Sequence, residues 1–239
     1  MNQATQWDDV DRYVAQRLQL SDDVLESTLR ASDDAGLPAI NVAPNQGKML
    51  QLFAQMQGAR NILELGTLGG YSTIWLARAL PPEGRLVTLE YDERNAEVAR
   101  QNLARAGFAA MVDVRVGPAL RTLPELADEN AGPFDLVFID ANKEDTPEYF
   151  AWALRLSQVG SVIIVDNVVR AGALADESST SPQVQGMRRF LDDLAQEERV
   201  DATVVQTVGS KGYDGFALAV VVAAGMIGDC REAPATSRS

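Results

Sequence analysis

The stretch Ile62-Leu-Glu-Leu-Gly-Thr-Leu-Gly-Gly-Tyr-Ser72 decides the fold of this chain. A short apolar strand, residues 61–65, runs into a glycine-rich turn, residues 66–70, and a helix begins directly after the turn. A second predicted strand, residues 86–90, ends in the acid Glu90. Strand, glycine turn, helix, strand and acid are together typical of a nucleotide-cofactor site in an α/β fold.

The spacing of the glycines bears on which cofactor the turn would hold. A dinucleotide fingerprint places glycines as G-x-G-x-x-G, whereas here Leu68 occupies the second glycine position and Gly69 and Gly70 follow it. The turn is also entered by an acid, Glu64. An acid is unfavourable beside a pyrophosphate but suits a ligand that carries an ammonium group and a sulfonium. The alternative is an ordinary strand-to-helix turn whose glycines serve only packing.

Composition excludes several classes of function. The chain has 239 residues and 46% hydrophobic residues, enough for one α/β domain with a substantial core. Its formal net charge of −13 argues against nucleic acid or an anionic membrane as a partner. The absence of histidine excludes Ser-His-Asp and Cys-His catalysis and histidine zinc sites. Chemistry must therefore rest on carboxylates, lysine, amides or hydroxyls.

The N-terminal sequence and the cysteine content predict a cytoplasmic protein. Residues 1–9 are polar and lack the basic-then-apolar pattern of a signal peptide. The single cysteine, Cys230, permits no intramolecular disulfide and no thiolate metal cluster, which fits a reducing compartment. No apolar run approaches the ~20 residues needed to span a bilayer.

Hydrophobic periodicity predicts a helical N-terminal extension, residues 1–58, followed by alternating strands and helices. Strands are expected at residues 61–65, 86–90, 111–116, 134–140, 161–166, 203–207 and 216–222. Ser21 is expected to cap the second helix of the extension. The last link, residues 208–215, is too short for a crossover helix, so the last two strands should be antiparallel. We therefore expect one domain, residues 1–239, with a seven-stranded, mostly parallel Rossmann-like sheet and a flexible tail at residues 224–239.

Two of the predicted strands end in acids, Asp140 and Asp166, and Asn167 follows the second. Ligands of open parallel sheets lie beyond the carboxyl ends of the strands, so these side chains should converge. Their oxygens suit Mg²⁺, with Mn²⁺ or Ca²⁺ as substitutes, and suit zinc poorly. Lys143 can reach the same place and, beside a cation, could act as a base. The alternatives are helix caps or solvated acids, and an exposed loop lysine.

Five motifs occur in order that resemble the cation-dependent class I S-adenosylmethionine O-methyltransferases, the bacterial form of the catechol and caffeoyl-CoA O-methyltransferase-like family. They are Glu64-Leu-Gly-Thr-Leu-Gly-Gly-Tyr-Ser72, Glu90, Phe138-Ile-Asp140-Ala-Asn-Lys143, Asp166-Asn167-Val-Val-Arg-Ala-Gly172 and Tyr213-Asp214-Gly215. The resemblance covers roughly residues 42–221 and implies the class I methyltransferase fold and a homodimer.

The resemblance also implies roles for particular residues. The metal ligands are expected to be Asp140, Asp166 and Asn167, and the catalytic residues Lys143, as the base, and Asp140. The positions matched to cofactor binding are Val42, Glu64, Gly66, Thr67, Ser72, Glu90, Ala119 and Asp140. Within that set, Glu90 is matched to ribose binding and Ser72 to the methionine end of the cofactor. Val42 lies in a segment expected to fold over the cofactor, and Ala119 beside the adenine.

This sequence departs from the family pattern at two places. Pro118 and Ala119 cannot donate a side-chain hydrogen bond, so adenine recognition there must depend on backbone and shape. The stretch 207–210 lacks the glutamate with which the mammalian catechol enzymes contact their substrate. Free catechol is therefore not assumed to be the substrate.

The function implied is methylation of a hydroxyl of a vicinal dihydroxy aromatic, either catechol-like or caffeoyl-like. S-Adenosylmethionine would be the methyl donor, Mg²⁺ would lower the pKa of the hydroxyl, and Lys143 would accept its proton. Two alternatives stay open at this point. One is a non-catalytic cofactor-binding module, and the other is an NAD-dependent oxidoreductase, which Glu64 and Leu68 disfavour.

Overall fold

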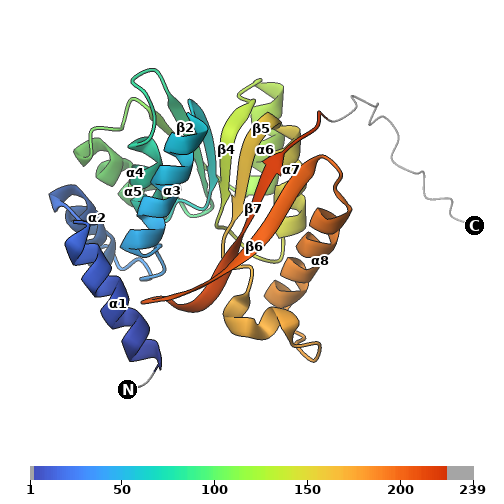
Figure 1. The fold of residues 1–239 in the computed structure, drawn as a ribbon. Coiled ribbons are helices and arrows are strands. Elements are labelled where there is room, and N and C mark those ends of the chain that lie inside the picture. The colour runs from blue at the N-terminus through green and yellow to red at the C-terminus, as the bar shows by residue number, and fades with distance from the viewer. Residues whose placement is uncertain (1–2, 225–239) are drawn as a thin grey trace, which may run out of the picture.

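The computed structural model describes residues 3–224, in which seven strands form one sheet with helices packed against it (Figure 1). The strands are β1 (Asn61–Leu65), β2 (Arg85–Glu90), β3 (Val112–Val116), β4 (Phe134–Ile139), β5 (Ser157–Val165), β6 (Val200–Gly209) and β7 (Gly212–Val221). The helices are α1 (Gln3–Arg17), α2 (Asp23–Asp34), α3 (Pro44–Gln57), α4 (Tyr71–Ala77), α5 (Glu93–Arg105), α6 (Ala119–Asp128), α7 (Thr146–Arg155), the 3₁₀ helix η1 (Arg170–Ala175) and α8 (Pro182–Gln196).

The strand order is β3-β2-β1-β4-β5-β7-β6, which confirms the predicted Rossmann-like sheet. Pairing is parallel from β3 to β5, while β7 runs antiparallel to both β5 and β6. The chain winds outward from β1 in one direction and from β4 in the other. The reversal therefore lies between β1 and β4, and a crevice opens beyond the carboxyl ends of these two strands.

Buried apolar side chains form a core on each face of the sheet. On one face, Leu126 and Phe150 of α6 and α7 pack in the same cluster as Val137 of β4. On the other face, Ile74 of α4 packs in the cluster that contains Phe138. Neighbouring residues of β4 point to opposite faces, so both faces need apolar side chains. This explains the near-continuous apolar run of that strand.

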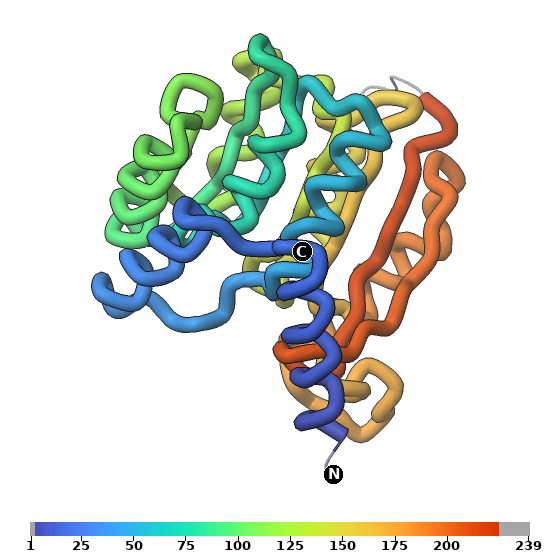
Figure 2. Tube along the Cα trace, turned by 60° about the vertical axis from the view of Figure 1, so that its left-hand side comes forward, coloured from blue at the N-terminus to red at the C-terminus, as the bar shows by residue number. Residues whose placement is uncertain are grey.

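The N-terminal extension is helical, as predicted, and its first helix lies beside the tip of the β6–β7 hairpin (Figure 2). Asp11 of α1 accepts a hydrogen bond from the backbone N–H of Ser210, 2.8 Å away. The predicted cap of the second helix was wrong. Asp22, rather than Ser21, caps α2 and accepts the N–H of Leu25 at 3.0 Å, since its side chain lies closer to the first helical turn.

The strand boundaries differ most at the end of the chain. β5 begins at Ser157 rather than at residue 161, and the last two strands extend to a two-residue turn at residues 210–211. The added residues of β6 are largely exposed, so they lack the apolar pattern by which a strand is found, although their backbone groups are paired. The antiparallel pairing of β6 and β7 is confirmed.

None of the helices in the described part of the chain combines the length and apolar composition that crossing a lipid bilayer requires. Of the predicted flexible tail, residues 225–239 lie outside the described residues, as does Cys230.

Candidate active site

The glycine turn after β1 is shaped by close contacts within the protein. Gly66 has a φ of +100°, and a Cβ atom there would lie 2.1 Å from the carbonyl oxygen of Asp140. A Cβ atom on Gly69 would lie 2.1 Å from the hydroxyl oxygen of Ser32 in α2. Gly70, with a φ of +82°, forms the N-terminal cap of α4. Gly66 therefore lets the turn approach the end of β4, and Gly69 lets it approach α2, so both glycines serve packing within the protein.

Glu64 lies beneath this turn, fully buried in the last part of β1. Its carboxylate accepts hydrogen bonds from the hydroxyls of Ser72 (2.7 Å), Thr73 (2.5 Å) and Thr88 (2.7 Å). Burial raises the pKa of Glu64 to about 7, against the opposing effect of these hydroxyls and with a small contribution from the negative charge of Asp140. Glu64 therefore acts on the cavity through Ser72, which does line it.

Glu90 lies at the end of β2, and its carboxylate binds backbone N–H groups of the glycine turn. One carboxylate oxygen accepts the N–H groups of Thr67 (3.2 Å) and Leu68 (2.7 Å). The other accepts from Asp92 N–H (3.0 Å) and from the amide of Asn95 (3.3 Å). A carboxylate has about four acceptor positions, so these hydrogen bonds satisfy Glu90 and fix its orientation beside the turn.

Beyond β4 and β5 the predicted acidic residues come together. The ammonium group of Lys143 donates to the Asp140 carboxylate at 2.8 Å, and Lys143 is only 8% exposed. Asp166 is buried behind them, and its carboxylate accepts the N–H of Asn167 at 2.8 Å. Burial, together with the neighbouring charge of Asp140, raises the pKa of Asp166 to about 7. The two carboxylates are therefore near each other, and Asn167 lines the same cavity as Asp140.

The donor chemistry of this group fits a hard divalent cation. Among the described residues, no group of three or more His, Cys, Asp or Glu side chains could hold a metal ion, so a cation here would need the amide oxygen of Asn167 beside the two carboxylates. Asn167 has a φ of +57°, a backbone conformation that asparagine tolerates better than most residues. Carboxylate and amide oxygens are the ligands that Mg²⁺, Mn²⁺ and Ca²⁺ accept.

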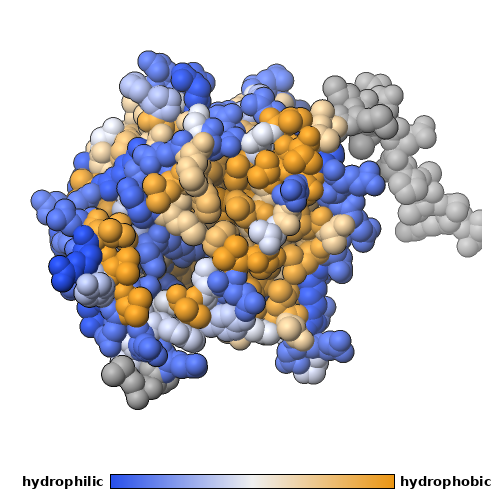
Figure 3. All heavy atoms as spheres, viewed as in Figure 1, coloured by the Kyte–Doolittle hydropathy of each residue, from blue (hydrophilic) through white to orange (hydrophobic). Residues whose placement is uncertain are grey.

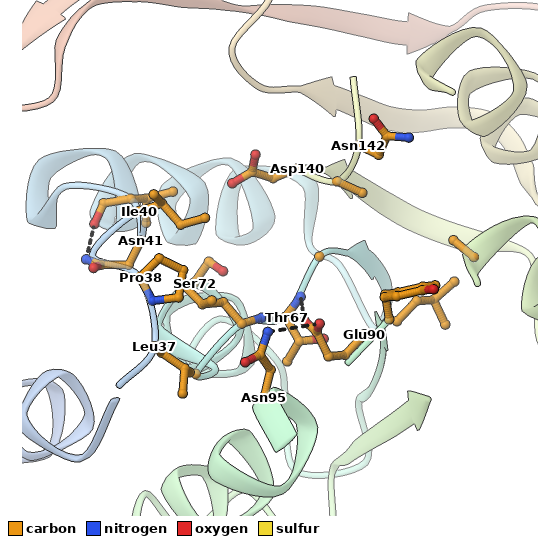
Figure 4. A pocket seen from close by; sticks show the side chains of 18 of the residues that line it. Leu37, Pro38, Ile40, Asn41, Thr67, Ser72, Glu90, Asn95, Asp140 and Asn142 are labelled. Carbon is orange, nitrogen blue, oxygen red and sulfur yellow. Dashed lines mark hydrogen bonds between the residues drawn. The ribbon is translucent and has the colours of Figure 1, made fainter. Parts of the chain in front are cut away.

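The glycine turn and the acidic group open into the same cavity, which has a volume of about 1020 Å³ (Figure 4). The predicted site residues that line it are Val42, Gly66, Thr67, Ser72, Glu90, Ala119, Asp140, Lys143 and Asn167. Glu64 and Asp166 are not part of the lining, since both are buried behind it. The segment 37–42 between α2 and α3 borders the cavity, in agreement with the position expected for Val42.

Several residues that support the site carry no strong local signal in the sequence. Asp214 accepts the N–H groups of Val169 (3.0 Å), Arg170 (2.9 Å) and Gly215 (2.9 Å), and so holds the turn that follows Asn167. In the sequence, only its place in the Tyr-Asp-Gly motif indicated that Asp214 is important. Gln46 in the first turn of α3 donates to the Asp166 carboxylate at 2.7 Å, and no sequence feature pointed to it.

Tyr149 also lines the cavity, and sequence analysis missed it. Burial, with a contribution from the negative charge of Asp145, raises the pKa of Tyr149 to about 12. Its hydroxyl therefore stays protonated at neutral pH.

Comparison with known proteins agrees with this geometry. The O-methyltransferase family model matches residues 16–220. The chain is 55% identical over 215 residues to a catechol O-methyltransferase of Niastella koreensis, a match that covers 90% of this chain and 97% of that protein. The fold matches an O-methyltransferase from Bacillus cereus in complex with SAH, with a TM-score of 0.90, 56% identity and coverage of 91% of this chain and 99% of that one.

A third similar protein is the O-methyltransferase TomG from Streptomyces achromogenes, which is involved in tomaymycin synthesis and was solved in complex with SAM. It matches with a TM-score of 0.90 and 51% identity, over 93% of this chain and 100% of that one. The family model and these matches span most of the described residues, including both sides of the cavity. This chain therefore belongs to the O-methyltransferase family of enzymes.

Proposed function

We propose that this enzyme transfers a methyl group from S-adenosylmethionine to a hydroxyl of a vicinal dihydroxy aromatic, with the help of a divalent cation. One observation carries the proposal: a single cavity joins the glycine turn and Glu90 to the group formed by Asp140, Lys143 and Asn167. A cofactor and an oxygen-rich substrate could thus lie side by side. Family membership speaks against the NAD-dependent oxidoreductase and the non-catalytic module.

At the turn, the chain offers groups suited to each part of the cofactor. Glu90 would accept from the ribose hydroxyls, and Ser72, with Gly66 and Thr67, would border the methionine end. Ala119 would flank the adenine, and Val42 would cover the cofactor from the segment before α3. The bound cofactor would supply an electrophilic methyl group. The cocrystallised SAH and SAM of two similar proteins support this assignment.

At the acidic end, Asp140, Asp166 and Asn167 would hold Mg²⁺, or Mn²⁺ or Ca²⁺ in its place. The cation would supply Lewis-acid chemistry, lowering the pKa of a substrate hydroxyl. The ammonium nitrogen of Lys143 lies against Asp140 and, once deprotonated, would accept the hydroxyl proton. Most of the rate acceleration would come from alignment and electrostatic preorganisation.

A methyl-transfer screen over dihydroxy aromatics, with and without Mg²⁺, tests the proposal. Transfer should need both S-adenosylmethionine and a divalent cation, stop in excess EDTA and return when Mg²⁺ is restored. Full activity in excess EDTA would refute the cation, and failure to bind S-adenosylmethionine would refute the cofactor. NAD serves as the negative control in the binding titration.

We also propose that the enzyme is a cytoplasmic homodimer. Apolar side chains gather over the face that Figure 3 shows. Exposed apolar side chains on α3 and on the edge pair β6–β7 include Leu52, Met56, Val205 and Val220. The edge strand β6 has one free side, and a second copy of this chain could cover both it and these residues. Analytical ultracentrifugation would detect the dimer, and Val205→Lys should weaken it.

A further inference from the structure

The orientation of the Asp166 carboxylate depends on one side chain from a distant part of the chain. One oxygen of Asp166 accepts the N–H of the adjacent Asn167, and the other accepts the side-chain amide of Gln46, 2.7 Å away. Lys143 donates to Asp140 rather than to Asp166. Among the described residues, Gln46 is therefore the side chain that hydrogen-bonds this carboxylate.

Gln46 is held in place by its own neighbours. Its N–H donates to the side-chain oxygen of Asn45 at 3.0 Å, and the amide nitrogen of Asn45 donates to Asp11 of α1 at 3.0 Å. The other oxygen of Asp11 accepts from Ser210 at the tip of the β6–β7 hairpin. Helix α1 and the hairpin thus hold the start of α3 from outside the cavity.

Packing on the inner side also fixes the start of α3. A Cβ atom on Gly47 would lie 2.4 Å from the indole ring of Trp75 in α4, so the first turn of α3 presses directly against that ring. The helix therefore cannot shift toward α4. The amide of Gln46 reaches Asp166 because contacts on both sides of the first turn of α3 place it there.

We propose that Gln46 is a positioning residue for the cation site, which it serves by fixing the rotamer of Asp166; this inference rests on the proposed function. A neutral amide is suited to that task. It orients one oxygen of the carboxylate without cancelling the negative charge that attracts a cation, as a lysine ammonium would. Removing a residue that hydrogen-bonds a metal ligand commonly lowers the affinity for the metal about 10- to 100-fold.

The test replaces Gln46 by a side chain of similar length that cannot donate a hydrogen bond. Gln46→Met should weaken Mn²⁺ binding about tenfold, measured on the full chain without substrate from the electron paramagnetic resonance signal of free Mn²⁺. The constant for activation by Mg²⁺ should rise by the same factor, while kcat at saturating Mg²⁺ stays near the wild-type value. Gln46→Asn, which withdraws the amide by one methylene, should bind Mn²⁺ with a similar loss.

A matched control exists on the same helix. Gln57 of α3 donates its side-chain amide to the carbonyl oxygen of Gly160 at 2.6 Å, near the opposite end of the helix from Gln46. Gln57→Met should leave Mn²⁺ affinity unchanged. The affinity of Gln46→Met for S-adenosylmethionine should match the wild type.

Each other outcome overturns the inference in a different way. Wild-type Mn²⁺ affinity in both Gln46 variants would refute the positioning role and leave the cation site intact. A loss of Mn²⁺ affinity that comes with a lower unfolding temperature and weaker cofactor binding would show a general structural role instead. Absence of Mn²⁺ binding by the wild-type enzyme would refute the cation site and, with it, the role of Gln46.

Discussion

Glu64 should make the stability of this enzyme fall as the pH rises from about 4.5 to about 7. Its carboxyl is fully buried, and burial raises its pKa from 4.5 to about 7 in the folded protein. Between these two values the folded protein keeps a proton that the unfolded chain releases. The stabilisation is therefore complete below the unfolded pKa and is lost as the pH rises through the folded pKa.

The magnitude follows from the difference between the two pKa values. Each pH unit corresponds to about 1.4 kcal/mol, so Glu64 should contribute about 3 kcal/mol to the change in the free energy of unfolding across this range. Three hydroxyl donors oppose the effect, because they stabilise the charged carboxylate. Glu64→Gln removes the titration and keeps the shape and most of the hydrogen bonds.

Urea unfolding between pH 5 and pH 8, followed by tryptophan fluorescence, measures the effect. The free energy of unfolding should depend less on pH in Glu64→Gln than in the wild type. Across this pH range the difference between the two proteins should approach about 3 kcal/mol. Asp166, whose pKa is also raised to about 7, titrates in both proteins and cancels in the comparison. Glu83→Gln, at a side chain 76% exposed, should keep the wild-type slope. Identical slopes in wild type and Glu64→Gln would show that the hydroxyls outweigh burial and that Glu64 is ionised.

Three further substitutions test other parts of the site. Glu90→Ala should weaken S-adenosylmethionine binding by about 1–3 kcal/mol, read by calorimetry, and unchanged affinity would place the ribose elsewhere. Lys143→Ala should lower kcat by about 10²- to 10⁴-fold with little change in cofactor affinity, and the rate should recover as the pH approaches the pKa of the substrate hydroxyl. A near wild-type kcat at neutral pH would refute the base. Gly66→Ala should cost about 3 kcal/mol or more in unfolding free energy, because its Cβ would meet the carbonyl of Asp140; Gly58→Ala, with open space around its Cβ, should cost less.

The sequence by itself determined the architecture and a part of the cavity lining. Alternating apolar strands and helices require a parallel sheet, and parallel strands bring the acids at their carboxyl ends to one edge. For this reason the order of residues along the chain is enough to place Asp140 and Asn167 beside the glycine turn. These inferences use local periodicity and chain direction, both of which are readable over a few residues.

Only the tertiary structure decided which groups face the cavity and which stand behind it. Glu64 is in the motif but is buried under the turn. It contacts the cavity through Ser72, whose hydroxyl donates to its carboxylate and which lines the cavity. Gln46 and Asp166 are separated by 120 residues and meet because α3 packs against α4. A hydrogen bond across such a distance in sequence depends on the packing of several elements at once. No pattern of neighbouring residues encodes it, so the sequence alone could not reveal it.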